Sequence, residues 1–239
     1  MNTSRFGEAV ILGVALCIGL ITLGYLVSKS AISVKRSDRT VVVKGLSERE
    51  VPANIAIWPI TFNEADNDLN TLSSSIEKKG SMITDFLLKN GFKVEEISVS
   101  SPTILDRLAE GYVDAAKVRY RYSANITITV YSTDVPLVRK TMSKLVQLGK
   151  QGIAIAGQQY QARTEFLFTK LNEIKPDMIE EATKNARQVA EKFAKDSESK
   201  LGKIKDAKQG QFSITDRDSN TPYIKKVRVV STVEYYLSD

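Results

Sequence analysis

Histidine is absent from this chain of 239 residues. The side chain that most often serves as general base, pH switch and transition-metal ligand is therefore missing, which excludes most metalloenzymes. The single cysteine, Cys17, excludes an intramolecular disulfide, a cysteine zinc site and a thiol–base pair. We therefore expect a protein that is not an enzyme and has no catalytic, cofactor-binding or metal-binding residues and no cofactor.

A large excess of either positive or negative residues is also missing. Lysine and arginine number 34 against 28 aspartate and glutamate residues, a net charge of +6. The basic residues alternate with acids along most of the chain, whereas nucleic-acid-binding proteins gather them on one face. We therefore expect no nucleic acid partner, and an anionic lipid surface fits this charge better.

One long apolar run stands near the N-terminus. Residues 9–27, AVILGVALCIGLITLGYLV, contain no charged residue. As a helix they would span about 28 Å, close to the roughly 30 Å hydrocarbon core of a bilayer. This run predicts a transmembrane helix that contacts the lipid bilayer, between a short tail at 1–8 and a juxtamembrane linker at 28–39. The alternative is a cleavable signal peptide, whose apolar region is usually shorter.

The charges beside this run bear on its orientation. Arg5 precedes it, while Lys29, Lys35, Arg36 and Arg39 follow it. The positive-inside rule alone would place the following domain in the cytoplasm. Long domains are often exported despite such a bias, so the residues leave the orientation open.

Residues 40–239 predict one α+β domain with mixed, mostly antiparallel sheets and about three amphipathic helices. Strands are expected at 40–45, 51–65, 94–105, 117–131, 159–171, 204–214 and 226–237, with Pro59 at a bulge or an edge. Helices are expected from Asp66 or Asn67 to Gly91, from Asp134 to Gly149, and from Pro176 to Gly202. The last should bury Met178, Ala182, Ala186, Val189, Phe193 and Leu201.

Four segments in order resemble the SIMPL-domain family of bacterial envelope proteins: VVVKGLSEREVPANIAIWPITF, FLLKNGFKVEEISVSSPTI, YSANITITVYSTD and EEATKNARQVAEKFAKDSESKLGKI. They fall within residues 40–237. The first carries Gly45 and Pro52, the second Leu88, Gly91 and Ile97, and the last a repeated Ala, Arg and Lys pattern. The chain departs from the family at Ala53, where aspartate is common, and in an apolar run that looks like a retained helix where the family usually has a cleavable signal peptide.

The resemblance implies a SIMPL-like α+β fold without an established catalytic site. It also implies an envelope location, a link in some members to oxidative-stress tolerance, and ring-like or channel-like homo-oligomers. It therefore favours a single-pass protein of the bacterial inner membrane whose soluble domain faces the periplasm, despite the local Lys and Arg count.

Three groups of residues could carry a site. Lys117, Arg119 and Arg121 share one face of a predicted strand, with Tyr120 and Tyr122 on the other, so bases could not stack beside phosphate contacts. Ser73, Ser74 and Ser75 lie in a predicted helix without a histidine partner. Acidic residues could form a carboxylate pair or a cation site, although nothing fixes two of them together: Glu48, Glu50, Glu95, Glu96, Asp106, Glu110 and Asp114.

The sequence therefore favours a membrane-anchored, non-catalytic protein that assembles with copies of itself. The alternatives are a small-molecule- or lipid-binding periplasmic module and, less favoured, a hydrolase with a carboxylate site.

Overall fold

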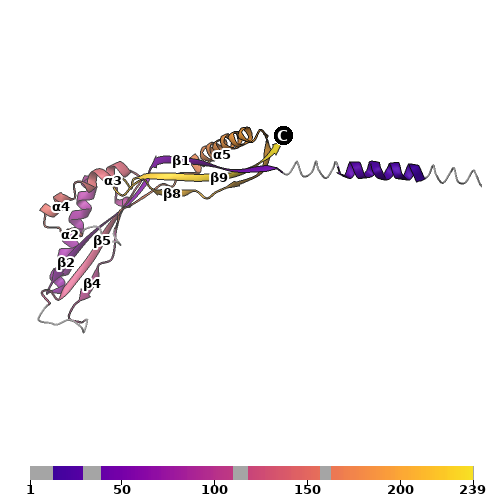
Figure 1. The fold of residues 1–239 in the computed structure, drawn as a ribbon. Helices are drawn as coiled ribbons and strands as arrows, with labels where there is room; N and C mark the ends of the chain where they lie inside the picture. The colour runs from indigo at the N-terminus through magenta and orange to yellow at the C-terminus, as the bar shows by residue number, and fades with distance from the viewer. Residues whose placement is uncertain (1–12, 29–38, 110–117, 157–162, 239) are drawn as a thin grey trace, which may run out of the picture. The chain divides into compact units, whose positions relative to one another are not determined.

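The structure, a computed structural model, describes residues 13–28, 39–109, 118–156 and 163–238. From residue 40 it is an α+β protein, as predicted (Figure 1). The strands are β1 Thr40–Pro52, β2 Ile55–Asp66, β3 Ile97–Val99, β4 Thr103–Asp106, β5 Tyr122–Ser132, β6 Glu165–Leu167, β7 Lys200–Gln209, β8 Ser213–Asp216 and β9 Ile224–Ser238. The helices that follow β1 are α2 Leu69–Lys89, the 3₁₀ turn Val94–Glu96, α3 Val135–Met142, α4 Val146–Lys150 and α5 Leu171–Asp196.

The predicted transmembrane segment 9–27 is only partly described, because residues 9–12 lie outside the described residues. Residues 13–28 form a helix. Within the described part of the chain, no helix is both long and apolar enough to cross a bilayer. The described residues thus do not support the predicted span.

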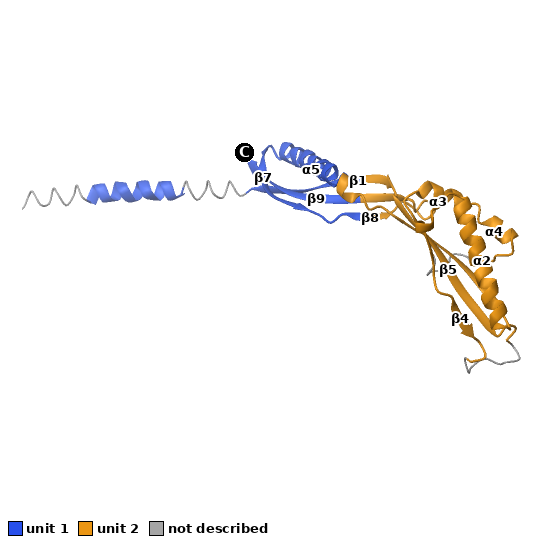
Figure 2. Ribbon diagram, turned by 180° about the vertical axis from the view of Figure 1, so that it is seen from behind, with its two compact units in different colours: residues 1–48, 174–213, 228–239 blue, residues 49–173, 214–227 orange. Residues whose placement is uncertain are grey.

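The described chain forms two compact units, coloured separately in Figure 2. One comprises residues 49–173 and 214–227, and the other the described residues among 1–48, 174–213 and 228–239. We call them the pocket unit and the alanine-helix unit, after the features described below.

In the pocket unit, the sheet order is β3-β5-β2-β6, and β4 also pairs with β5. The central pair β2–β5 is antiparallel over an unbroken register from Ala56↔Ser132 to Asp66↔Tyr122. Alternate residues of both strands enter one core with α2 and α3: Ala56, Trp58, Ile60, Phe62, Ala124, Ile126, Ile128 and Val130. This confirms the predicted inward face of 117–131 from Ala124 onward. Pro59 stands opposite Thr129 in this unbroken register, so the predicted bulge is absent, and β2 lies between β5 and β6 in the sheet order. The edge position of Pro59 stays a prediction.

Helix α2 begins one or two residues later than predicted, because Asp68 is its N-cap instead of Asp66 or Asn67. The Asp68 carboxylate accepts a hydrogen bond from the Thr71 backbone N–H at 2.8 Å. Its C-terminal end matches the prediction. Gly91 has φ +102°, the Gly91 N–H donates to the Leu88 carbonyl, and the Phe92 N–H donates to the Leu87 carbonyl, which is a Schellman motif.

Three predicted elements of the pocket unit are shorter or divided. The predicted strand 94–105 becomes a 3₁₀ turn, β3 and β4. Asp134 caps α3 as predicted, through the Leu137 N–H, but residues 143–145 interrupt the helix and leave Val146 exposed. Of the predicted strand 159–171, residues 159–162 lie outside the described residues, only Glu165–Leu167 are strand, and Leu171 already begins α5.

The strands of the alanine-helix unit form a sheet in the order β1-β9-β7. Strand β8, of which only Ser213 belongs to this unit, also pairs with β9. One face is covered by α5, whose buried residues are Met178, Ala182, Ala186, Ala190 and Ala194. We call these four alanines, at positions 182, 186, 190 and 194, the alanine stripe. Two of them, Ala186 and Ala190, share a core cluster with Val43 of β1 and with Val233 and Tyr235 of β9, as the alternation predicted for 226–237 requires.

The small stripe allows α5 to lie against the backbone of β1. A Cβ atom built on Gly45 would stand 1.9 Å from the Ala182 carbonyl oxygen and 2.4 Å from the Ala186 nitrogen. Only glycine leaves room for such an approach. Two expected members of the buried face are instead partly exposed, Val189 and Phe193. The prediction was wrong there because it favoured large apolar residues where the packing requires small ones.

The predicted ends of this helix were also wrong. Pro176 lies inside α5, where its nitrogen has no hydrogen to donate to the Asn172 carbonyl. The helix ends at Asp196, and Glu198, with φ 52°, turns the chain in the left-handed conformation. Gly202 is part of β7, against the Tyr236 carbonyl.

Candidate functional site

The predicted basic strand face does not form. Lys117 lies outside the described residues, and Arg119 and Arg121 precede β5, which begins at Tyr122. The Arg121 guanidinium pairs with the Asp106 carboxylate at 2.9 Å and also lies over the Tyr122 ring, 4.9 Å from its centroid. Its hydrogen bonds lower the pKa of Asp106 below the usual range. Arg121 is therefore a structural cation that holds the β4–β5 pair.

Three of the described acidic residues singled out from the sequence, Glu50, Glu96 and Asp106, have partners in separate places. Glu50 lies 3.5 Å from the Arg217 guanidinium, and Glu96 accepts the Lys93 backbone N–H at 2.9 Å. Glu110 and Asp114 lie outside the described residues. Within the described ranges, no three acidic or cysteine side chains are placed to hold a metal ion.

The three serine hydroxyls all donate hydrogen bonds to nearby residues. Ser73 and Ser74 donate to the carbonyls of Leu69 and Asn70, each at 2.9 Å. Ser75 donates to the Glu64 carboxylate at 3.2 Å. Ser73 and Ser74 are thus helix serines bonded back to the preceding turn, and Ser75 is bonded to a carboxylate that also pairs with Lys79.

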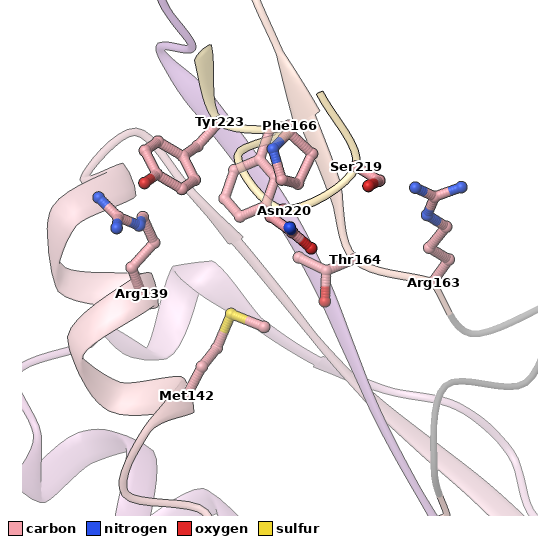
Figure 3. A pocket seen from close by; sticks show the side chains of 9 residues that line it. Arg139, Met142, Arg163, Thr164, Phe166, Ser219, Asn220 and Tyr223 are labelled. Atoms are coloured by element: carbon pink, nitrogen blue, oxygen red, sulfur yellow. The ribbon is translucent and has the colours of Figure 1, made fainter. Parts of the chain in front are cut away.

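A pocket of about 440 Å³ in the pocket unit is the candidate site (Figure 3). Three segments that are far apart in the sequence form it: helix α3, the strand β6 with the residues before it, and the loop between β8 and β9. Its lining side chains are Arg139, Met142, Arg163, Thr164, Phe166, Ser219, Asn220, Pro222 and Tyr223. A volume of this size suits a small molecule.

One wall of the pocket is an aromatic stack capped by a cation. The Arg139 guanidinium carbon lies 3.4 Å from the centroid of the Tyr223 ring, and Phe166 meets that ring edge-on at 6.1 Å. Figure 3 shows Arg139 reaching from α3 toward Tyr223. The Ala53 N–H donates to the Tyr223 carbonyl at 2.8 Å and fixes the base of the stack. A guanidinium stacked on a ring keeps its N–H edges free for a ligand.

The loop at 217–224, which brings Ser219 and Asn220 as well as Tyr223 to the pocket, is organised by Asp218. Its carboxylate accepts the N–H groups of Asn220 and Thr221 at 2.9 and 2.8 Å, the Thr221 hydroxyl, and the Arg217 guanidinium. The Thr221 hydroxyl, and then Arg217, hold the pKa of Asp218 far below its usual range. The Asp218 carboxylate is thus bonded within its own loop and does not pair with the arginines of the pocket.

The Asp218 bonds predict a pH-dependent stability. A carboxyl whose native pKa is depressed stabilises the fold above its unfolded pKa of about 4, and this stabilisation is lost as the pH falls through the native value. We expect Asp218→Asn to lower the thermal midpoint at neutral pH, and this deficit to shrink below about pH 4. Circular dichroism melts of both proteins across this range measure it. An equal deficit at every pH would contradict this role.

Several polar groups of the pocket have no partner among the residues that the structure describes. The side chains of Arg139 and Arg163 make no hydrogen bond or ion pair with any residue that the structure describes. The same holds for the Thr164 hydroxyl, although Thr164 is only 8% exposed. The sequence analysis missed this site, because no local motif joins residues 139, 163 and 220. The only signal was the exposed turn chemistry of the segment Asp218–Thr221.

A search of curated proteins found no match. A family model matches residues 41–234, which include both compact units, and it is described as "SIMPL: Protein of unknown function (DUF541)". The match confirms the resemblance seen in the opening strand, the Gly91 turn, β5 and α5. The chain belongs to the SIMPL family.

Proposed function

We propose that this protein is a non-catalytic envelope protein, tethered to the inner membrane by residues 9–27, that assembles with copies of itself into a ring- or channel-like homo-oligomer. The family resemblance adds periplasmic exposure of the domain and a role in envelope or oxidative stress. The observation that carries the assembly is the free edge of β1. The non-catalytic character rests on the missing histidine and the lone Cys17.

Strand β1 is an edge strand of 13 residues, paired among the described strands only with β9. Its first nine residues, Thr40–Glu48, carry one lysine, and Val42 is 60% exposed. The opposite edge, β7, carries four exposed lysines, Lys200, Lys203, Lys205 and Lys208. Lysines are a common protection of edges against pairing with another chain. The contrast marks β1 as the edge that is open to strand addition.

The membrane tether would strengthen such a contact. Only the linker 28–39 separates the N-terminal run from β1. Copies held in one membrane plane meet at a high effective concentration, so a weak edge contact suffices for assembly.

The test is the mass of the full-length protein in mild detergent, measured by light scattering. We expect the wild type to have several times the 26.5 kDa of one chain, and Val42→Lys to shift it toward the monomer, because the new cation protects the edge. Val146→Lys is the matched control, since Val146 is also exposed, at 70%, but lies on α4. A monomeric wild type, or equal masses for all three proteins, would refute assembly through β1.

A second function, binding of a small molecule or lipid, is favoured by the pocket between α3, β6 and the 217–224 loop. It has unpartnered donors, an aromatic wall and a suitable volume. A molecule held by the folded state raises the thermal midpoint. A melt screen of neutral, cationic and anionic compounds therefore tests this function. The hydrolase alternative gains no support from the scattered carboxylates.

A further inference from the structure

The pocket presents hydrogen-bond donors without matching acceptors. Two guanidinium groups belong to its lining. Arg139 extends from α3, and Arg163 lies just before β6. The hydroxyls of Thr164 and Ser219 and the amide of Asn220 complete the polar lining. None of the described lining residues carries a carboxylate. A ligand with acceptor oxygens and negative charge would satisfy this set.

The acids closest in sequence are directed elsewhere. Asp218 is occupied by its own loop, as described above. Glu165 is exposed and lies between Thr164 and Phe166 in an extended segment, so its side chain points to the other face. The two arginines therefore give the pocket an uncompensated positive charge.

We propose that this pocket binds the phosphate group of a small phosphate monoester. The inference rests on the second proposed function, binding at the pocket, and adds the chemical class of the ligand. A monoester phosphate carries close to two negative charges and three terminal oxygens near neutral pH, which suits a lining that offers guanidinium groups and hydroxyl and amide donors.

The geometry of each donor supports this assignment. Stacking on Tyr223 fixes the Arg139 guanidinium plane and leaves its edge for a bidentate contact. Thr164, a residue only 8% exposed, offers a hydroxyl for which the described residues supply no hydrogen-bond partner. Met142, Phe166 and Pro222 supply apolar surface for the organic part of the molecule. The pocket can thus hold an ester better than bare phosphate.

The experiment is calorimetric titration of full-length protein in mild nonionic detergent. The probes are glycerol 3-phosphate, inorganic phosphate, succinate as a dicarboxylate, and glycerol as the uncharged control. We expect glycerol 3-phosphate to bind most tightly, inorganic phosphate more weakly, and succinate and glycerol least. Added salt should weaken binding, because the attraction is between charges.

Variants locate the binding. Arg139→Gln and Arg163→Gln should each raise the Kd for glycerol 3-phosphate at least about tenfold, and Thr164→Val should raise it less. Arg119→Gln is the matched control, because Arg119 also lies over a tyrosine ring, that of Tyr120 at 5.5 Å, but outside this pocket. Its Kd should equal that of the wild type. Far-UV circular dichroism verifies that each variant is folded.

Phosphate could come from a soluble ester or from a lipid head group. Vesicles of phosphatidic acid in phosphatidylcholine, beside phosphatidylcholine alone, separate these sources when protein binding is measured by co-sedimentation. Binding to phosphatidic acid that Arg139→Gln abolishes assigns the lipid; binding of glycerol 3-phosphate alone assigns the soluble ester.

Two results would overturn the phosphate assignment. One is the absence of binding for all phosphate probes. The other is binding that the arginine variants leave unchanged. If a neutral or cationic compound instead raises the wild-type midpoint and Tyr223→Ala removes that rise, the pocket still binds a small molecule and only its ligand class is wrong.

Discussion

Replacing Gly45 with alanine is expected to destabilise the alanine-helix unit by more than about 3 kcal/mol, at the upper end of overpacking effects. The new methyl group would stand 1.9 Å from the Ala182 carbonyl oxygen. That oxygen belongs to the backbone of α5, so no rotamer change can relieve the collision. The helix must separate from β1 and expose the buried stripe.

The measurement is urea unfolding of full-length protein in mild detergent, followed by circular dichroism. The matched control is Gly80→Ala, because Gly80 lies in α2 and an added Cβ meets nothing within 4 Å. Alanine should stabilise α2 by about 0.5–1 kcal/mol through its higher helix propensity. Equal unfolding midpoints for Gly45→Ala and wild type would show that α5 does not lie against β1 as described.

Ala186→Leu is expected to cost about 2–3 kcal/mol, because a larger side chain enters a packed interface. Ala186 is fully buried against the sheet. By contrast, Phe193→Ala on the same helix should change the stability by less than about 0.5 kcal/mol, since Phe193 is 55% exposed. The same unfolding experiment compares the two. A larger loss of stability for Phe193→Ala than for Ala186→Leu would show that Phe193 lies on the buried face of the helix, as hydrophobicity predicted.

Elements with strong local signals could be predicted from the sequence. The Gly91 turn and the Asp134 cap each depend on one residue and its immediate neighbours. The inward face of β5 follows from two-residue alternation between Ala124 and Val130. These features require no knowledge of distant parts of the chain.

Other features depend on contacts between distant residues. The buried face of α5 is set by Gly45, more than a hundred residues earlier, and hydrophobicity alone pointed to Val189 and Phe193. Likewise, the pocket joins three segments that carry no shared motif. Arg121 was predicted as part of a basic strand face, yet its ion pair with Asp106 arises only when β4 pairs with β5.

The close approach at Gly45 also bears on evolution. Most buried positions can change when a neighbouring side chain changes in compensation. At position 45 the obstacles are a carbonyl oxygen and a backbone nitrogen, which no second substitution removes. Natural variants of this protein should therefore keep glycine at position 45, even where the residues around it have diverged.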